Sequence, residues 1–373
     1  MNDLDLLELA KKLFQNLTSK EEQIISLSMK ATSNNEADTS IDLNNSKRFL
    51  DSFRVDSKPS MCKPKGNVLI LLSYNEPLLL SIVPIFCALA MGNKVIVRPS
   101  SKNSELFRIL WNIDGCGLLD RLVILDFHIS ELPEYVKDSK AVYFFGSYEH
   151  SKDVYKLCAE YNVEYIPEVE TADIKIINYE TKNFDIVRDI YATLENSYTH
   201  LGKICQRISG VFVKETMFDA YLEELKAYMC LNGYKKVKTF DDNSILSRDL
   251  FAAQPKEVFL KDSKSVAVCP DIQSEYVKKA YFAMNLWIVP FTDLSDLLLQ
   301  LNRRKFFHGV NIRSNDSLFT EEIINKTNFS RYTLNDSHCD ISSDSGWGGN
   351  WPSGSGGYKS WYETFSNRFT VIR

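Results

Sequence analysis

The chain has 373 residues, of which 44% are hydrophobic and 25% are charged, and its formal net charge is −5. This length suits two domains with a sizeable core, and the composition is that of an ordinary soluble globular protein. Because nucleic-acid binding needs a strongly basic surface, the small acidic excess excludes a nucleic-acid partner.

Cysteine usage points to a reduced protein without a metal centre. The chain contains 8 cysteines and 5 histidines, with no Cys-x-x-Cys pair. No cluster has the spacing of zinc ligands, so we expect neither a disulfide scaffold nor a metal site. Thiols stay reduced inside cells, and we therefore expect a cytoplasmic protein.

Neither a signal peptide nor a membrane span is predicted. The first 17 residues read as an amphipathic helix with acids in its first turn, whereas a signal peptide starts with basic residues before an apolar run. Residues 77–92 are the most apolar segment, but they are short for a bilayer and include Pro84. This segment favours a buried helix, and we expect no membrane partner.

The chain order of the predicted elements indicates an α/β fold. We expect helices from residue 1 to about 60, with a polar break near residues 31–40. From Gly66 onward, short apolar runs alternate with helical segments; the predicted strands are 66–73, 93–100, 121–127, 141–147 and 163–169. This alternation is typical of a doubly wound parallel sheet, which binds ligands at the carboxyl ends of its strands.

A second series of alternating elements begins at about residue 172. Its predicted strands are 172–178, 207–213, 309–314 and 330–335, and two further elements, whose type is left open, are expected at 264–269 and around 286–291. Its predicted helices are 184–197, 216–229, 296–305 and 318–327. Beyond them lies a segment rich in Gly and Trp, residues 346–358, which is either a linker or a loop packed beside a site.

Two short stretches invite a functional interpretation but do not settle it. Gly146 and Ser147 end a predicted strand just before a helix, and a helix N-terminus can hold a pyrophosphate. An ordinary capped helix explains the same two residues, and the chain has no G-x-G-x-x-G motif. Cys205, in the stretch HLGKICQRISG, is either a small core residue or a nucleophile.

The order of five partial motifs resembles the aldehyde dehydrogenase superfamily over roughly residues 50–373. Residues 66–100 are similar to the family's G-V start, P-W-N-x-P turn, A-x-G-N helix end and K-P-S strand end. FFGSYEH is similar to F-T-G-S, IPEVETADIKII stands in the place of L-E-L-G-G-K-x-P, and GKICQRISGVFV is similar to G-Q-x-C with its following strand. WGGNWPSGSGG is similar to F-G-G-x-K-x-S-G-x-G.

This resemblance implies a catalytic role for three residues. Cys205 matches the family nucleophile, which attacks a carbonyl carbon and forms a thiohemiacetal and then a thioester. Asn75 matches the amide that stabilises the developing oxyanion together with the cysteine's own N–H. Glu168 matches the base that activates water. Read without the family, Asn75 is a turn residue, Glu168 a surface acid and Cys205 a core residue.

The resemblance also implies a nicotinamide cofactor. Gly146 and Ser147 match the turn that faces its pyrophosphate, and Arg98 takes the place of a lysine that contacts its ribose. The family acid that binds the adenine ribose is replaced in RPSSK by Ser101 or Lys102, which favours NADP(H) over NAD(H). From the same strand ends we expect three more cofactor-binding residues: Tyr74, Ser100 and Ser101.

Several family features are replaced, and they leave the reaction open. Glu170 and Thr171 stand for a glycine pair, residues 280–287 lack the acid of E-x-F-G-P, and Thr199 and His200 replace an asparagine. The favoured function is NAD(P)-dependent oxidation of a small-molecule aldehyde to a carboxylic acid. One alternative is NADPH-dependent reduction of an acyl-CoA or carrier-bound acyl thioester to an aldehyde, and another is a non-catalytic member of the family.

The expected fold is that of aldehyde dehydrogenases, with three parts. Residues 1–171 would form N-terminal helices and a doubly wound nucleotide-binding domain, and residues 172–345 an α/β catalytic domain. Residues 346–373 would close the site and, with part of 52–65, supply a small oligomerisation strand that extends a partner's sheet. We therefore expect a homodimer or a dimer of dimers.

Overall fold

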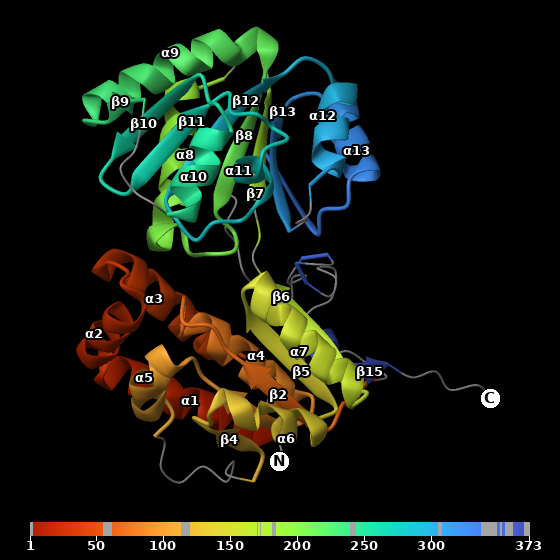
Figure 1. Cartoon of the computed structure of the whole chain (residues 1–373). Helices are drawn as coiled ribbons and strands as arrows, with labels where there is room; N and C mark the ends of the chain where they lie inside the picture. Colours follow the sequence, from red (N-terminus) through yellow and green to blue (C-terminus); the bar gives the residue numbers. More distant parts are fainter. Residues whose placement is uncertain are drawn as a thin grey trace, which may run out of the picture. The chain divides into compact units, whose positions relative to one another are not determined.

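The computed structural model describes residues 3–54, 62–112, 120–169, 171, 173–180, 184–238, 244–304, 308–336, 349–350, 353–354 and 361–368. They fall into two compact units, coloured red to yellow and green to blue in Figure 1 apart from the last residues. Unit 1 holds the described residues within Met1–Val169 and Gly354–Arg373, and unit 2 those within Glu170–Asp340 and Gly348–Ser353.

Unit 1 is built on a sheet of five parallel strands. The strand order is β4-β3-β2-β5-β6, with β2 (Asn67–Leu71), β3 (Lys94–Arg98), β4 (Leu122–Ile124), β5 (Ala141–Gly146) and β6 (Glu164–Val169). All five predicted strands are present. The chain builds outward from β2 to β4 and then restarts at β5 on the other side of β2. This reversal of direction makes the β2–β5 boundary the topological switch point of the sheet.

Helices cover both faces of this sheet. On one face lies α4 (Leu79–Ala90), all of whose residues are buried because helices surround it; they include α1 (Asp3–Ser19), α3 (Glu36–Ser52) and α14 (Trp361–Thr364). The apolar segment 77–92 is therefore the buried helix that its composition predicts. On the same side are α2 (Glu21–Thr32) and α5 (Ser104–Leu110), and the opposite face carries α6 (Leu132–Lys137) and α7 (Tyr148–Glu160).

A small two-stranded sheet joins distant parts of unit 1. Strand β1 (Cys62–Pro64) pairs antiparallel with β15 (Ser366–Arg368). Both strands fall within 52–65 and 346–373, the two ranges expected to supply an oligomerisation strand; residues 55–61 and 369–373 lie outside the described residues. Next to it, Trp361 and Phe365 are buried, and the Asn93 side chain donates a hydrogen bond to the Phe365 carbonyl at 2.8 Å.

Unit 2 contains an eight-stranded mixed sheet in the order β14-β13-β7-β8-β12-β11-β10-β9. The strands are β7 (Asp173–Asn178), β8 (Ile208–Lys214), β9 (Lys235–Val237), β10 (Glu257–Lys261), β11 (Lys264–Val268), β12 (Asn285–Phe291), β13 (Gly309–Ser314) and β14 (Arg331–Leu334). Six of these strands pair in parallel. Four of them (β7, β8, β13 and β14) were predicted as strands, and β11 and β12 lie where elements of open type were expected. The antiparallel strands β10 and β9 at one end of the sheet were missed by the sequence analysis.

Two layers of helices enclose the unit 2 sheet. Helices α8 (Ile186–Tyr198) and α9 (Glu215–Leu231) cover one face. The other face is covered by α10 (Ile245–Ala252), α11 (Glu275–Lys278), α12 (Leu294–Asn302) and α13 (Ser317–Lys326). Successive side chains of β12 point to opposite faces of the sheet. Leu286 and Ile288 pack against the first layer of helices, and Trp287 and Val289 pack against the second.

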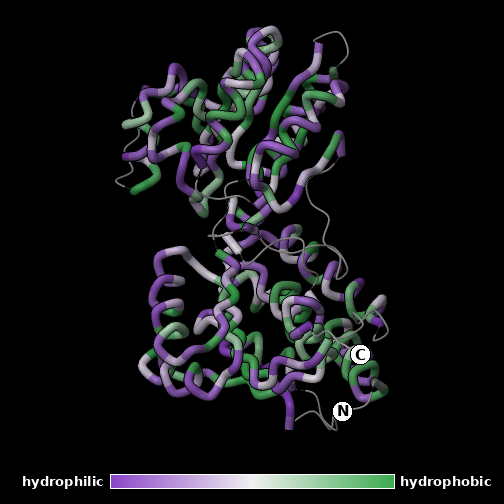
Figure 2. Tube along the Cα trace, turned by 90° about the vertical axis from the view of Figure 1, so that its right-hand side faces the viewer, coloured by the Kyte–Doolittle hydropathy of each residue, from purple (hydrophilic) through white to green (hydrophobic). Residues whose placement is uncertain are grey.

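Hydropathy along the chain agrees with this layering. Figure 2 shows long hydrophobic stretches in the interior of each unit and mixed colouring along the outer helices. Among the helices of the described residues, none is both long enough and apolar enough to span a bilayer.

Candidate functional site

The carboxyl ends of four strands bring eight of the predicted site residues to one edge of the unit 1 sheet. In the register of the parallel strands, Leu71 lies beside Arg98 and Phe144, and Gly146 lies beside Val169. The loops that leave these strands therefore start at the same edge, at and around the switch point. The residues gathered there are Tyr74, Asn75, Arg98, Ser100, Ser101, Gly146, Ser147 and Glu168.

Two side chains from outside the turn hold the segment that carries Asn75. The Asn103 amide donates hydrogen bonds to the carbonyls of Ser73 and Tyr74, both at 3.3 Å. The Asp42 carboxylate accepts from the amides of Leu78 at 3.2 Å and Leu79 at 2.9 Å. These bonds fix both sides of the half-buried Asn75, so its side-chain amide is presented on a turn with little freedom.

Acidic side chains cluster beneath this turn. Asp42 is 3% exposed, and its burial raises its pKa to about 6 although the two amide bonds oppose the shift. Glu76, which has a left-handed backbone with φ 61°, follows Asn75 directly. Burial, with repulsion from Asp42 and Asp38, raises the pKa of Glu76 well above its usual value. The charge beside the turn thus depends on pH, because burial favours the protonated form of both acids.

The loop after β5 leads into the N-terminus of α7. Ser147 caps α7 by accepting from the amide of His150 at 3.3 Å, and its hydroxyl lies 3.0 Å from the His150 Nδ1. A Cβ on Gly146 would lie 2.6 Å from the Phe144 ring, so glycine is needed at this bend. The N-terminus of a 13-residue helix next to a glycine suits the pyrophosphate of a dinucleotide.

The loop after β3 is partly occupied by internal contacts. Arg98 Nε donates to the Phe127 carbonyl at 3.1 Å, and the guanidinium lies 5.3 Å from the centre of the Phe127 ring. The exposed Lys102 places its ammonium 4.1 Å from the centre of the Tyr74 ring. The side chain of Lys102 therefore stays beside the β2 loop, whereas Arg98 is anchored toward the segment after β4.

Glu168 lies at the end of the edge strand β6, opposite Phe145 of β5. It is half-buried, and burial raises the pKa of its carboxyl well above the usual value. A carboxyl group with a raised pKa is a stronger base toward a water molecule, provided that the pH is high enough to ionise the group. Gly354, from the segment rich in Gly and Trp, pairs with Glu168 in an isolated antiparallel bridge, so this part of the segment packs against β6.

Cys205 lies in unit 2, in the loop 199–207 that connects α8 to β8. Two side chains of α8 hold the two ends of this loop together. The Asn196 side-chain oxygen accepts a hydrogen bond from the Ile208 amide at 2.6 Å, and the Ser197 hydroxyl donates one to the Ile208 carbonyl at 2.7 Å. Cys205 is half-buried and forms no disulfide, and it differs in burial from Cys87 and Cys158, which are buried core residues.

The backbone of the loop is strained and closely packed. His200, Leu201 and Gly202 all have left-handed backbone angles, with φ 50°, 56° and 71°. A Cβ on Gly202 would lie 2.2 Å from the Ala283 carbonyl oxygen, so no other residue fits there without movement. The Thr171 hydroxyl donates a hydrogen bond to the Cys205 carbonyl. Strain of this kind persists only where the surroundings hold it, and it is enriched at functional sites.

The family assignment follows from a direct comparison. The model of the aldehyde dehydrogenase family matches residues 8–241, which is more than half of the chain. The chain belongs to the aldehyde dehydrogenase family. The resemblance to this family is thereby confirmed, and the matched range includes four of the five motifs together with Asn75, Glu168 and Cys205.

Relatives of this aldehyde dehydrogenase family member are distant. A 4,4'-diapolycopene-4,4'-dial dehydrogenase of Cytobacillus firmus is 24% identical over 274 residues, 67% of this chain and 58% of the relative. A 4,4'-diaponeurosporen-aldehyde dehydrogenase of Staphylococcus aureus is 23% identical over 332 residues, 83% of this chain and 72% of the relative. The chain spans only 55–64% of the length of the first three relatives that it matches.

Solved structures show the same fold. Aldehyde dehydrogenase 21 from Physcomitrella patens, in complex with its product succinate, superposes with a TM-score of 0.81 at 15% identity, covering 98% of this chain and 85% of that one. Glyceraldehyde-3-phosphate dehydrogenase from Methanocaldococcus jannaschii, complexed with NADP, gives 0.80 at 17% identity, covering 98% and 89%. The aldehyde dehydrogenase fold predicted from the sequence is therefore confirmed.

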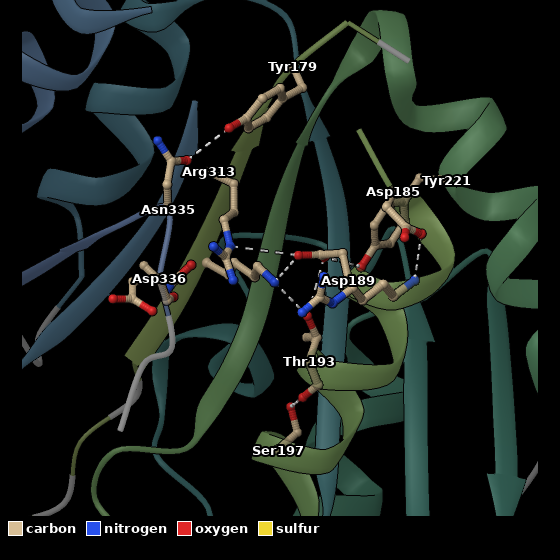
Figure 3. Close-up of polar contacts among 12 residues, drawn as sticks. Tyr179, Asp185, Asp189, Thr193, Ser197, Tyr221, Arg313, Asn335 and Asp336 are labelled. Atoms are coloured by element: carbon tan, nitrogen blue, oxygen red, sulfur yellow. Dashed lines mark hydrogen bonds and ion pairs between the residues drawn. The ribbon is translucent and has the colours of Figure 1, made fainter. Parts of the chain in front are cut away.

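A buried polar cluster that the sequence analysis missed anchors α8, the helix leading to Cys205. Lys175 of β7 forms an ion pair with Asp189 and donates to Thr193 at 2.9 Å. Figure 3 shows Asp189 and Thr193 close to Tyr221 and Arg313; the Tyr221 hydroxyl lies 3.4 Å from Asp189, and Arg313 Nε 3.9 Å. The available signal was a lysine among the isoleucines of a buried strand and an acid on the apolar face of a helix.

Among the described residues, no group of three or more His, Cys, Asp or Glu side chains is arranged to hold a metal ion.

Proposed function

We propose that this chain is an NAD(P)-dependent oxidoreductase that oxidises an aldehyde to a carboxylic acid with Cys205 as the nucleophile. The observation that supports this most is the 199–207 loop, which holds a half-buried cysteine on a strained backbone whose two ends are held together by hydrogen bonds. A fold that only needed to connect α8 to β8 has no reason to maintain three consecutive left-handed residues there.

Each catalytic residue has a defined task in this reaction. The Cys205 thiolate attacks the carbonyl carbon, a C–S bond forms, and the carbonyl oxygen becomes an oxyanion that accepts hydrogen bonds from the Asn75 amide and the Cys205 N–H. A bound nicotinamide supplies the acceptor for the hydride that leaves the same carbon. Glu168 then takes a proton from water, whose oxygen attacks the thioester; the C–S bond breaks and the carboxylate leaves.

The cofactor residues fit a dinucleotide phosphate. Gly146, Ser147 and the N-terminus of α7 provide the pyrophosphate cradle, and Tyr74, Arg98 and Ser100 line the neighbouring strand ends. Ser101 and Lys102 put a hydroxyl and an exposed cation where an acid would repel a 2′-phosphate, which favours NADP(H). Structural neighbours include proteins described with NADP and as NAD-dependent, so side-by-side kinetics with both cofactors is the test.

Reduction of an acyl thioester with NADPH is the second candidate, and the raised pKa of Glu168 favours it. A carboxyl that keeps its proton at the working pH does not activate water, so the enzyme thioester survives long enough for reduction to an aldehyde. The acyl donor would be an acyl-CoA or a carrier-bound thioester, because both transfer an acyl group to a thiolate without a change of oxidation state.

Intact-mass spectrometry separates these functions from a non-catalytic protein. The chain is incubated with acyl-CoA thioesters without cofactor, then with aldehydes and NADP or NAD; the aldehydes include 4,4'-diapolycopene-4,4'-dial, after the name of one relative. An acyl adduct that disappears in Cys205→Ala and persists in Cys269→Ala, another half-buried thiol, supports a nucleophile. If no acyl adduct forms and no cofactor is reduced, both catalytic proposals are refuted.

We further propose the domain division 1–171, 172–345 and 346–373, a cytoplasmic location and assembly into a homodimer or dimer of dimers. The β1–β15 pair supports the assembly proposal, because a two-stranded ribbon has two free edges for a partner strand. Light scattering of the purified chain tests the oligomeric state, and a monomer at micromolar concentration would contradict it.

A further inference from the structure

Arg207, two residues after Cys205, is a buried cation whose hydrogen-bond partners are neutral. Its side chain is 1% exposed, and burial lowers its pKa to about 10. The nearest acid acting on it is Asp173, and this carboxylate is already hydrogen-bonded to the His308 ring and the Gly309 amide. Burying a guanidinium without a carboxylate in contact is costly, so packing alone does not explain an arginine here.

All three hydrogen bonds of the Arg207 guanidinium go to one short segment, residues 281–285. Nη1 donates to the Asn285 carbonyl at 2.9 Å, and Nη2 donates to the Asn285 side-chain oxygen at 2.9 Å and to the Tyr281 carbonyl. This segment leads directly into β12, which pairs in parallel with β8, the strand that begins after Arg207. The arginine therefore ties the starts of two neighbouring strands together.

The part of loop 199–207 that precedes Cys205 also packs against residues 281–285. Gly202 approaches it so closely that a Cβ would lie 2.2 Å from the Ala283 carbonyl oxygen. Loop 199–207 thus rests on residues 281–285 at two points, Gly202 before Cys205 and Arg207 after it. The segment is itself fixed, because the Asn285 amide bonds to the Ala283 carbonyl at 2.8 Å and the Met284 carbonyl accepts from Ser265 at 2.8 Å.

We propose that Arg207 is a positioning residue that docks loop 199–207 on residues 281–285 and so sets the position of the Cys205 thiol. The inference rests on the proposed role of Cys205. A planar guanidinium reaches three acceptors in one fixed geometry, whereas a lysine ammonium cannot span the same set. Nucleophile placement matters because a displacement of about 1 Å can cost about 100-fold in rate.

The first experiment compares Arg207→Ala and Arg207→Lys with Arg304→Ala. Arg304 is a matched control, since it is also a buried arginine of unit 2 with a pKa lowered to about 10, and its guanidinium lies over the Trp287 ring at 5.6 Å. For each variant, urea unfolding gives stability, and the rate of Cys205 acylation by p-nitrophenyl acetate gives reactivity. Labelling of Cys205 by iodoacetamide provides a rate that does not depend on the proposed substrates.

We expect Arg207→Ala to slow acylation by roughly 100-fold, mainly in the maximal rate and not in KM. Arg207→Lys should be intermediate, and added guanidinium ion at millimolar concentration should restore part of the rate of Arg207→Ala. Arg304→Ala should lose similar stability with a Cys205 rate within about threefold of wild type, because its guanidinium packs on Trp287 inside β12, beyond residues 281–285.

Equal loss of Cys205 reactivity in Arg207→Ala and Arg304→Ala, or wild-type reactivity in a folded Arg207→Ala, would overturn the proposal. If Arg207→Ala does not fold, Arg207→Lys carries the same comparison. If the wild type is not acylated, the proposed function of Cys205 is refuted. The proposal for Arg207 is still tested in that case, because the iodoacetamide rates report whether Arg207 positions the thiol.

Discussion

Replacing Asp42 by asparagine tests how the turn that carries Asn75 is stabilised. The carboxylate is 3% exposed and accepts two amide hydrogen bonds at the start of α4. Its pKa rises from 3.8 to about 6 in the folded chain, which corresponds to about 3 kcal/mol at 1.36 kcal/mol for each pKa unit. Burial therefore outweighs the two hydrogen bonds, and ionisation of Asp42 opposes folding.

The sign of the pH dependence follows from proton uptake. Between about pH 4 and pH 6 the folded chain keeps the Asp42 proton while the unfolded chain has released it, so stability from this group falls as the pH rises. Asparagine is neutral throughout and still accepts one amide bond. We expect Asp42→Asn to be about 1 kcal/mol less stable than wild type at low pH, for one lost bond, and to gain about 2 kcal/mol relative to wild type between pH 4.5 and pH 7.5.

Urea unfolding of wild type and variant at the two pH values measures this gain. Asp51→Asn, an exposed acid on the same helix, is the control and should show no comparable gain. A difference between wild type and Asp42→Asn that does not change with pH, or that changes in the opposite direction, would show that capping of α4 exceeds the cost of burying the charge.

Three further variants test the reactive loop and its support. Gly202→Ala should lower the urea midpoint and the Cys205 acylation rate together, because the residue has a positive φ and no room for a Cβ; an unchanged midpoint contradicts this. Asp189→Ala should cost about 3–5 kcal/mol in thermal unfolding, as it leaves Lys175 buried without its partner, whereas a loss below 1 kcal/mol would argue against the ion pair. Glu168→Gln should slow thioester hydrolysis by about 10²–10⁴-fold while acylation persists, and wild-type hydrolysis should rise with pH as Glu168 deprotonates; a flat profile excludes Glu168 as the base.

Much of the fold was predictable because its strands are short apolar runs. All five strands of the unit 1 sheet and four of the six parallel strands of unit 2 were found this way, as was the buried helix 77–92. Strand β10 (Glu257–Lys261) was missed because its apolar run, 258–260, is only three residues long. Strand β9 was missed because Lys235–Val237 is short and charged and lies at the edge of the sheet. Such edge strands carry little hydrophobic signal, since only one neighbour and one face are covered.

The candidate site was predictable only as a set of residue types in family order. The sequence placed Asn75, Glu168 and Cys205 through their motifs, but the residues that hold their loops lie far away along the chain. Asp42 caps a helix that starts 37 positions later, at Leu79, and Arg207 binds Asn285. Such pairings depend on tertiary packing, which local periodicity does not encode.

The closing residues of the chain complete a core that was begun near its start. Trp361 and Phe365 are buried against α4 and the first sheet, and Asn93 bonds to the Phe365 carbonyl. Unit 2 is therefore an insertion within unit 1, and during synthesis at about 5–20 residues per second it can fold while unit 1 still lacks its last piece. Until residue 365 has left the ribosome, part of the apolar α4 stays uncovered. A nascent chain stalled before Trp361 should therefore recruit holding chaperones, whereas one released after Phe365 should not.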